Sequence, residues 1–144
     1  IEQAERAFDK RQTDEMARKF LAEYEEFALG LQNTDGSWHP GFFSAKGAGR
    51  ELVGVLRATG HILEWLVSSL PEDRLQDRRV LLSMNYVTSL IENSYGQSNL
   101  PYAATREITA LMHALHALKV YDHRVFQQAG PDRPAQPASS TAAL

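Results

Sequence analysis

The segment Leu31-Gln32-Asn33-Thr34-Asp35-Gly36-Ser37-Trp38 decides the fold class of this chain. A helical pattern ends at Leu31, Asp35 and Gly36 supply a turn, and a second, more apolar helical pattern follows. The two residues that flank the turn suit contacts between helices. Gln32 offers both a hydrogen-bond donor and an acceptor, and Trp38 offers a flat apolar face. The segment therefore predicts an all-α protein built from antiparallel helical hairpins.

The helix before the turn is predicted to be an outer one. Thr13 is a suitable N-cap. Apolar residues then recur at helical spacing, as Met16, Phe20, Tyr24, Phe27 and Leu31. The opposite side of the helix is charged, which is typical of a helix that packs one face on a core. Residues 1–12 are charged and are taken as a separate N-terminal segment.

Three further helices are predicted. Residues 50–70 are apolar nearly all round, which indicates a buried helix, and Gly54 and Gly60 within it suit a close approach of two backbones. Asp77 and Thr105 are the expected N-caps of the third and fourth helices. The third helix is expected to bury Val80, Met84, Val87 and Ile91. The fourth is expected to bury Ile108, Leu111, Met112, Leu115, Leu118 and Tyr121.

The two hairpins resemble one another in sequence. Segment 31–38 aligns with segment 91–98 at an offset of 60, and the Asn and Gly keep their places. This predicts about two hairpin repeats over residues 13–128. Residues 129–144 consist mostly of Pro, Ala, Ser and Thr without periodicity, which predicts a disordered tail.

The segment after Phe27 resembles the QW motif of the terpenoid cyclase and protein prenyltransferase superfamily of α/α toroids. That motif is a Gln followed by G-x-W, with an aromatic residue five positions before the Gln. Here Phe27, Gln32, Asp35, Gly36 and Trp38 stand at the corresponding places. The resemblance implies inner and outer helices that alternate around a barrel, with the Gln amide bonded to a helix terminus and the Trp stacked on it. The alternative is an ordinary helix–loop–helix with one buried Trp.

The resemblance also implies a fragment, because members of the superfamily close their barrel with about six hairpins. The first residue is Ile1 rather than Met, which suits that expectation. Two hairpins leave apolar faces open. We expect upstream hairpins of the same protein, or a second copy, to cover them.

The catalytic signatures of the superfamily are missing. The sequence has no D-x-D-D segment to supply an acid and no cysteine to bind zinc. We therefore expect a non-catalytic scaffold or binding module for an apolar ligand, a glycan or a protein partner, with no cofactor. Two alternatives remain open. In the first, the chain is part of a cyclase-like or prenyltransferase-like enzyme whose catalytic acid lies upstream. In the second, it is a metal-dependent enzyme that uses His and Glu side chains.

Two inner helices carry polar residues at matching places. His61 and Glu64 are spaced i,i+3, as are His113 and His116, and an offset of 52 superimposes the two pairs. A rival offset of 56 aligns two Arg-Glu pairs instead and differs by about one helical turn. Brought together, the four side chains suit zinc or iron binding, or an acid–base pair. The alternative is a set of hydrogen-bonded histidines at a helix interface.

A second candidate site precedes the buried helix. Lys46, Gly47, Gly49 and Arg50 combine glycines with two cations, a pattern that can present N–H groups to an anion. The alternative is a flexible glycine loop with a solvated lysine.

Bulk properties narrow the class of protein. The net charge of -3 gives no basis for nucleic-acid binding. No run of about 18 apolar residues occurs, so no membrane span is predicted. We expect a soluble protein, and a chain without cysteine suits the cytoplasm and the periplasm equally.

Overall fold

The computed structural model describes residues 2–95 and 105–127, and the side chains of residues 10–93 and 108–127. Over these residues the regular elements are helical and no strand occurs, which confirms the all-α prediction. The long helices are α1 (Glu2–Gly30), α2 (Leu52–Ser69), α3 (Arg78–Tyr95) and α4 (Thr105–Asp122). Short 3-10 turns lie at Phe42–Ser44 and Glu72–Arg74, and a π-helical turn follows α4 at His123–Gln127. In this part of the chain no helix combines the length and apolar character that crossing a membrane requires.

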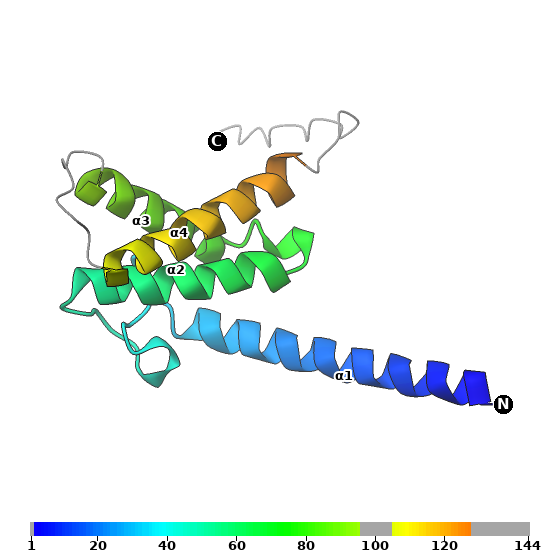
Figure 1. The fold of residues 1–144 in the computed structure, drawn as a ribbon. Helices are drawn as coiled ribbons and strands as arrows, with labels where there is room; N and C mark the ends of the chain where they lie inside the picture. The colour runs from blue at the N-terminus through cyan, green and yellow to red at the C-terminus, as the bar shows by residue number, and fades with distance from the viewer. Residues whose placement is uncertain (1, 96–104, 128–144) are drawn as a thin grey trace, which may run out of the picture.

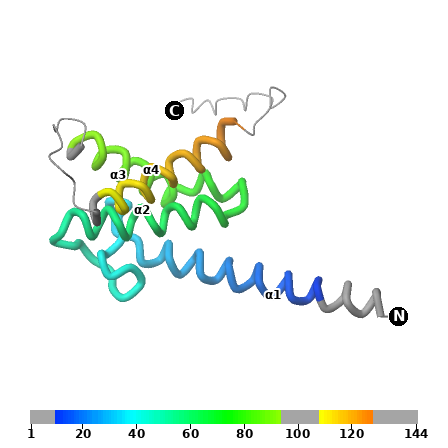
Figure 2. The backbone as a smooth tube through the Cα atoms, in the orientation of Figure 1, coloured from blue at the N-terminus to red at the C-terminus, as the bar shows by residue number. Residues whose placement is uncertain are grey.

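Three of the helices form one packed unit and the first extends away from it. α4 lies across α2 and runs in the same direction, whereas α3 runs the opposite way (Figure 1). α1 joins this unit only near its C-terminal end, and its N-terminal part points away (Figures 1 and 2).

The core forms around α2, as its apolar sequence predicts. Leu56, Leu63, Leu66 and Val67 of this helix are each at most 1% exposed. The other helices and the first loop contribute fully buried Trp38, Val80, Val87, Ala110, Ala114 and Ala117. Such burial stabilises the fold by about 1.5–3 kcal/mol for each large apolar side chain.

Small residues set the contact between α2 and α4. A Cβ atom added at Gly60 would lie 2.8 Å from the backbone nitrogen of Ala114, so the two backbones nearly touch. Only alanine-sized side chains fit beside such a contact. The prediction of which face of α4 is buried is therefore partly wrong. Its bulky members Ile108, Met112 and Leu115 are 52%, 62% and 44% exposed, and alanines take their place in the core.

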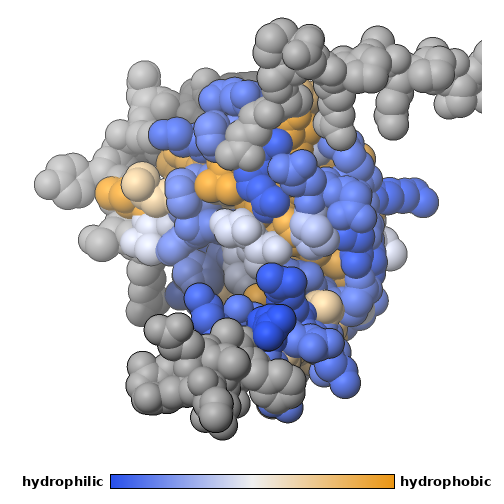
Figure 3. All heavy atoms as spheres, turned by 90° about the vertical axis from the view of Figure 1, so that its right-hand side faces the viewer, coloured by the Kyte–Doolittle hydropathy of each residue, from blue (hydrophilic) through white to orange (hydrophobic). Residues whose placement is uncertain are grey.

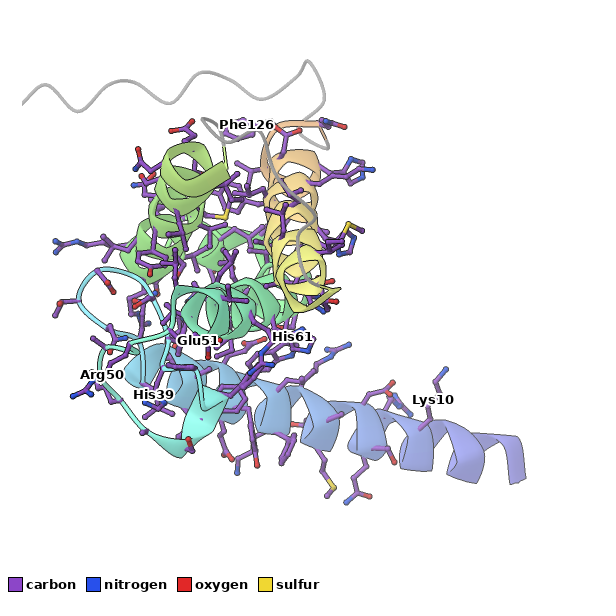
Figure 4. The ribbon with its side chains drawn as sticks, turned by 60° about the vertical axis from the view of Figure 1, so that its left-hand side comes forward. Lys10, His39, Arg50, Glu51, His61 and Phe126 are labelled. Atoms are coloured by element: carbon purple, nitrogen blue, oxygen red, sulfur yellow. The ribbon has the colours of Figure 1, made fainter. Side chains whose placement is uncertain are left out.

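The first helix differs from prediction in its start and in its buried face. It begins at Glu2 and runs through Thr13 without interruption, so Thr13 is not an N-cap. The side chains of residues 10–24 are all exposed, and burial begins at Glu25. Figure 4 shows Lys10 far from the packed helices. Ala28 and Leu29 are buried in the last turns. Of the predicted apolar stripe, Leu31 packs against the core, whereas Met16, Phe20, Tyr24 and Phe27 are exposed.

Asp77 caps α3 as predicted and also belongs to an ionic joint between α3 and α1. Its Oδ1 accepts the backbone N–H of Arg79 at 2.9 Å, and its Oδ2 lies 2.8 Å from the Arg79 guanidinium. Arg74 and Arg79 both pair with Glu26 near the end of α1. Hydrogen bonds from Arg79 lower the pKa of Asp77 from 3.8 to about 2, although burial acts in the opposite direction.

The predicted tail 129–144 and most of segment 91–98 lie outside the described residues. The disorder of the tail and the geometry of the second motif stay predictions.

Candidate functional site

The motif-like segment acts as a structural joint. Gln32 is 7% exposed, and its Nε2 donates to the Arg79 carbonyl at 2.7 Å and to Ser83 Oγ at 2.6 Å. Both acceptors belong to α3. Trp38 is fully buried, and its Nε1 donates to the carbonyl of Ala28 in α1 at 2.7 Å. The segment therefore connects the end of α1 to α3. Stacking of the Gln32 amide on the Trp38 ring stays a prediction.

Gly36 makes this joint possible. Its φ is 93°, in the left-handed region that favours glycine. A Cβ atom there would lie 2.8 Å from the backbone nitrogen of Ser83 and closer still to the Leu82 carbonyl. Ser83 Oγ donates to the Gly36 carbonyl at 2.7 Å. Asp35 supports the turn, because its Oδ1 accepts the N–H of Ser37 at 3.0 Å.

The glycine loop is occupied by contacts within the chain. The Gly47 N–H donates to Asn33 Oδ1 at 2.9 Å. Lys46 Nζ donates at 3.1 Å to the carbonyl of Gly30, the last residue of α1. Arg50 precedes Glu51, the N-cap of α2. Gly49 packs against the first turn of this helix, because a Cβ atom there would lie 2.7 Å from Val55 Cγ2. Arg50 points outward from the loop (Figure 4). This geometry favours a structural loop over an anion site.

The structure brings the four predicted polar residues of α2 and α4 together. Glu64 Oε2 lies 2.5 Å from His113 Nδ1, and Glu64 Oε1 lies 2.6 Å from His116 Nδ1. The rings of His61 and His113 meet edge to face, with centroids 4.1 Å apart. Glu64 therefore holds both histidines of α4 while His61 lies beside them. These contacts correspond to the offset of 52 and not to the rival offset of 56.

An open pocket of about 300 Å³ lies at this cluster and is lined by His61, Glu64, Trp65, Ser68 and His113. The His61 ring also packs nearly perpendicular to the Phe42 ring, with centroids 5.9 Å apart. Phe42 has a φ of 58°, a conformation that costs a non-glycine residue about 1–2 kcal/mol. The strained turn thus places an aromatic ring against His61. Figure 4 shows His61 at the edge of the α2–α4 pair that faces α1.

The cluster favours a charged carboxylate. Burial alone raises the pKa of Glu64, but the hydrogen bonds and electrostatic interactions with His116 and His113 outweigh it. The pKa of Glu64 is therefore lowered below its ordinary value. The side chain of Glu64 is 24% exposed and that of His113 is 30% exposed, so ions and small ligands can reach them.

The second feature is an apolar surface along α1, here called the α1 face: Met16, Phe20, Tyr24 and Phe27. These side chains are 68%, 57%, 46% and 51% exposed. Ring contacts continue the surface onto Phe43, whose centroid is 6.0 Å from that of Phe27. Apolar side chains also reach the surface between polar ones in the view of Figure 3.

Comparison with known proteins gives no relative: no family model matches the chain, and no curated protein or solved structure is significantly similar to it. The residues and their geometry are therefore the basis for any proposal.

Sequence reasoning did not identify three residues around the cluster. Trp65 and Ser68 follow His61 and Glu64 by four positions, so helical spacing places them on the same face of α2 and could have indicated both. Phe42 gave no such signal, because its position depends on the conformation of the loop.

Proposed function

We propose that this chain is a non-catalytic interaction module that binds a further helical segment on the α1 face. The exposed stripe of α1 carries the proposal. The QW-like segment suggests an α/α-toroid fragment, and such a fragment also needs a partner on its open face, because each hairpin of a toroid is covered by its neighbours. The parallel course of α2 and α4 is compatible with two adjacent inner helices of such a toroid (Figure 1).

The energetics of α1 support this function. Most helical stability in proteins comes from the packing of one apolar face rather than from the helix propensity of the residues. Residues 10–24 of α1 have no buried side chain. Moving a Phe or Met side chain from water into an interface contributes about 1.5–3 kcal/mol. A partner that covers the α1 face therefore stabilises both the helix and the complex.

The shape of the surface indicates a helix as the partner. Phe20 and Tyr24 have ring centroids 4.5 Å apart, and those of Tyr24 and Phe27 are 6.2 Å apart. The row continues from Phe43 to Trp65, with centroids 6.4 Å apart. A linear row of aromatic side chains suits the apolar face of an amphipathic helix. The exposed Ile108, Met112 and Leu115 of α4 offer a second apolar surface to the same kind of partner.

In a solution of this chain alone, the available helical partner is a second copy. We expect concentration-dependent self-association in light scattering coupled to size exclusion. Phe20→Glu places a charge in the α1 face and is expected to weaken association at least tenfold. Ala22→Glu is the matched control: it adds the same charge at an exposed position on the opposite side of the same helix, and association is expected to persist.

Circular dichroism of both variants checks that the fold is retained. A wild-type chain that stays monomeric at all concentrations and unfolds cooperatively would contradict the proposal. Equal weakening by the two variants would also contradict it, because charge in general, and not the α1 face, would then control association.

A further inference from the structure

We propose that His61, Glu64 and His113 form a binding site for a divalent first-row transition metal, with zinc as the representative ion, and that His116 positions the carboxylate. None of these residues belongs to the α1 face, although the aromatic row that starts there ends at Trp65, which lines the pocket of this site. The proposal does not depend on the interaction proposed above.

The placement of the donor atoms is the first argument. One ligand atom from each of His61, Glu64 and His113 lies within 4.8 Å of the other two. In a tetrahedral zinc site with bonds of about 2.1 Å, the ligand atoms are about 3.4 Å apart. Side-chain rotations on two fixed helices can adjust these separations, which include widening the 2.5 Å between Glu64 Oε2 and His113 Nδ1. Both histidine side chains are accessible from solvent.

The donor chemistry is the second argument. Two imidazoles and one carboxylate suit zinc and its first-row neighbours, whereas calcium and magnesium prefer oxygen ligands alone. The net charge of the three ligands with neutral imidazoles is -1, which favours a divalent cation. Three protein ligands leave a coordination position free, and the pocket beside Trp65 and Ser68 gives that position access to solvent.

The support around the donors is the third argument. Metal-bound carboxylates and histidines are usually held by further hydrogen bonds that fix their orientation. Glu64 has such a partner in His116, whose Nδ1 lies 2.6 Å from Oε1. Oε2 is the oxygen that faces His113, and its contact with His113 Nδ1 must open for both residues to bind a metal. His61 also contacts the Phe42 ring, in a near-perpendicular arrangement. The close packing of Gly60 on Ala114 fixes the two helices that carry the ligands.

The test uses the whole chain, stripped of metal with a chelator and titrated with Zn²⁺ in a calorimeter. We expect one equivalent to bind, with release of protons as the pH of the titration is lowered. Co²⁺ is expected to give the visible absorption of a four-coordinate site. Added Zn²⁺ is also expected to raise the melting temperature, because it binds the folded state.

Variants assign the roles. His61→Ala, His113→Ala and Glu64→Gln are expected to lower the affinity for Zn²⁺ by more than 100-fold. His116→Ala is expected to lower it by about 10–100-fold, as is typical for removal of a supporting hydrogen bond. His123→Ala is the control, because this histidine lies in the π-helical turn beyond α4, and no change is expected.

Three outcomes would overturn the proposal. They are the lack of stoichiometric Zn²⁺ binding by the wild-type chain, equal affinity in wild type and His61→Ala, and a Co²⁺ spectrum typical of the hexaaqua ion. The Co²⁺ spectrum of the wild type needs no variant, so the test stands even where a substitution unfolds the chain. Phe20→Glu is expected to bind Zn²⁺ normally, which separates this proposal from the proposed interaction function.

Discussion

Substitution of Gly36 by alanine probes the joint between the first loop and α3. Two independent features of this glycine oppose a side chain. Its φ of 93° lies in the left-handed region. A Cβ atom would also overlap the backbone of α3, at 2.8 Å from the nitrogen of Ser83 and closer to the Leu82 carbonyl. A backbone cannot rotate away as the end of a flexible side chain can, so α3 or the loop must move.

The magnitude follows from adding the two effects. A left-handed conformation costs a residue with a Cβ about 1–2 kcal/mol. Forcing a methyl group into a packed region costs about 1–3 kcal/mol. We therefore expect Gly36→Ala to lower the free energy of unfolding by about 2–5 kcal/mol. Gly47 is the matched control, since its φ is 128° but a Cβ atom there has no neighbour within 4 Å. Gly47→Ala is expected to cost only the conformational part, about 1–2 kcal/mol.

Urea unfolding followed by circular dichroism measures both variants against the wild type. For a domain of this size each kcal/mol also lowers the melting temperature by roughly 3–5 °C. The difference between Gly36→Ala and Gly47→Ala isolates the close approach to α3. If the two variants lose the same stability, the loop does not pack on α3 as described, and the role assigned to the joint is refuted.

Two further outcomes are expected. Trp38→Phe removes the hydrogen bond to the buried Ala28 carbonyl and part of the ring, and should lower the free energy of unfolding by about 2–4 kcal/mol in urea titrations. Trp65→Phe, at a partly exposed position, should lower the free energy of unfolding by less than about 1.5 kcal/mol. Equal losses in Trp38→Phe and Trp65→Phe would contradict a special role for the buried indole of Trp38. The pKa of Asp77 is lowered to about 2 in the folded protein. Its contribution to the free energy of unfolding is therefore complete at a pH above 3.8, its ordinary pKa, and is lost as the pH falls toward 2. Asp77→Asn keeps the N-cap but removes the charge pair with Arg79. At neutral pH this variant should be less stable than the wild type by up to about 2 kcal/mol, and the difference should shrink toward pH 2. A difference that does not depend on pH would contradict this assignment.

Local signals predicted the positions of the helices well. The N-cap at Asp77 is confirmed by its hydrogen bond to the Arg79 backbone, and α2 spans Leu52–Ser69 where residues 50–70 were predicted. Caps and apolar periodicity are properties of neighbouring residues, so a single sequence carries them. The N-terminal extent of α1 was not predicted, because the charged residues before Thr13 continue the helix without an apolar pattern.

Which face of each helix is buried was harder to predict, since that depends on other helices. The stripe of α1 is as periodic as a buried one, yet Phe20 is 57% exposed in the chain as described. On α4 the alanines and not the bulky residues face the core, because the closeness of α2 leaves no room for Met112 or Leu115. Periodicity identifies a face that can be buried, and the distance to the neighbouring helix decides whether it is.

The candidate metal site depends on one choice of register that the sequence left open. With an offset of 56 instead of 52, α4 would slide along α2 by one turn, about 5.4 Å. Leu118 would then take the place of Ala114 opposite Gly60, where even an added Cβ atom approaches the facing backbone to 2.8 Å. A leucine cannot occupy that space, so the small pair Gly60 and Ala114 excludes the rival register. The same contact that packs the helices thereby places His61 beside His113 and Glu64 beside His116.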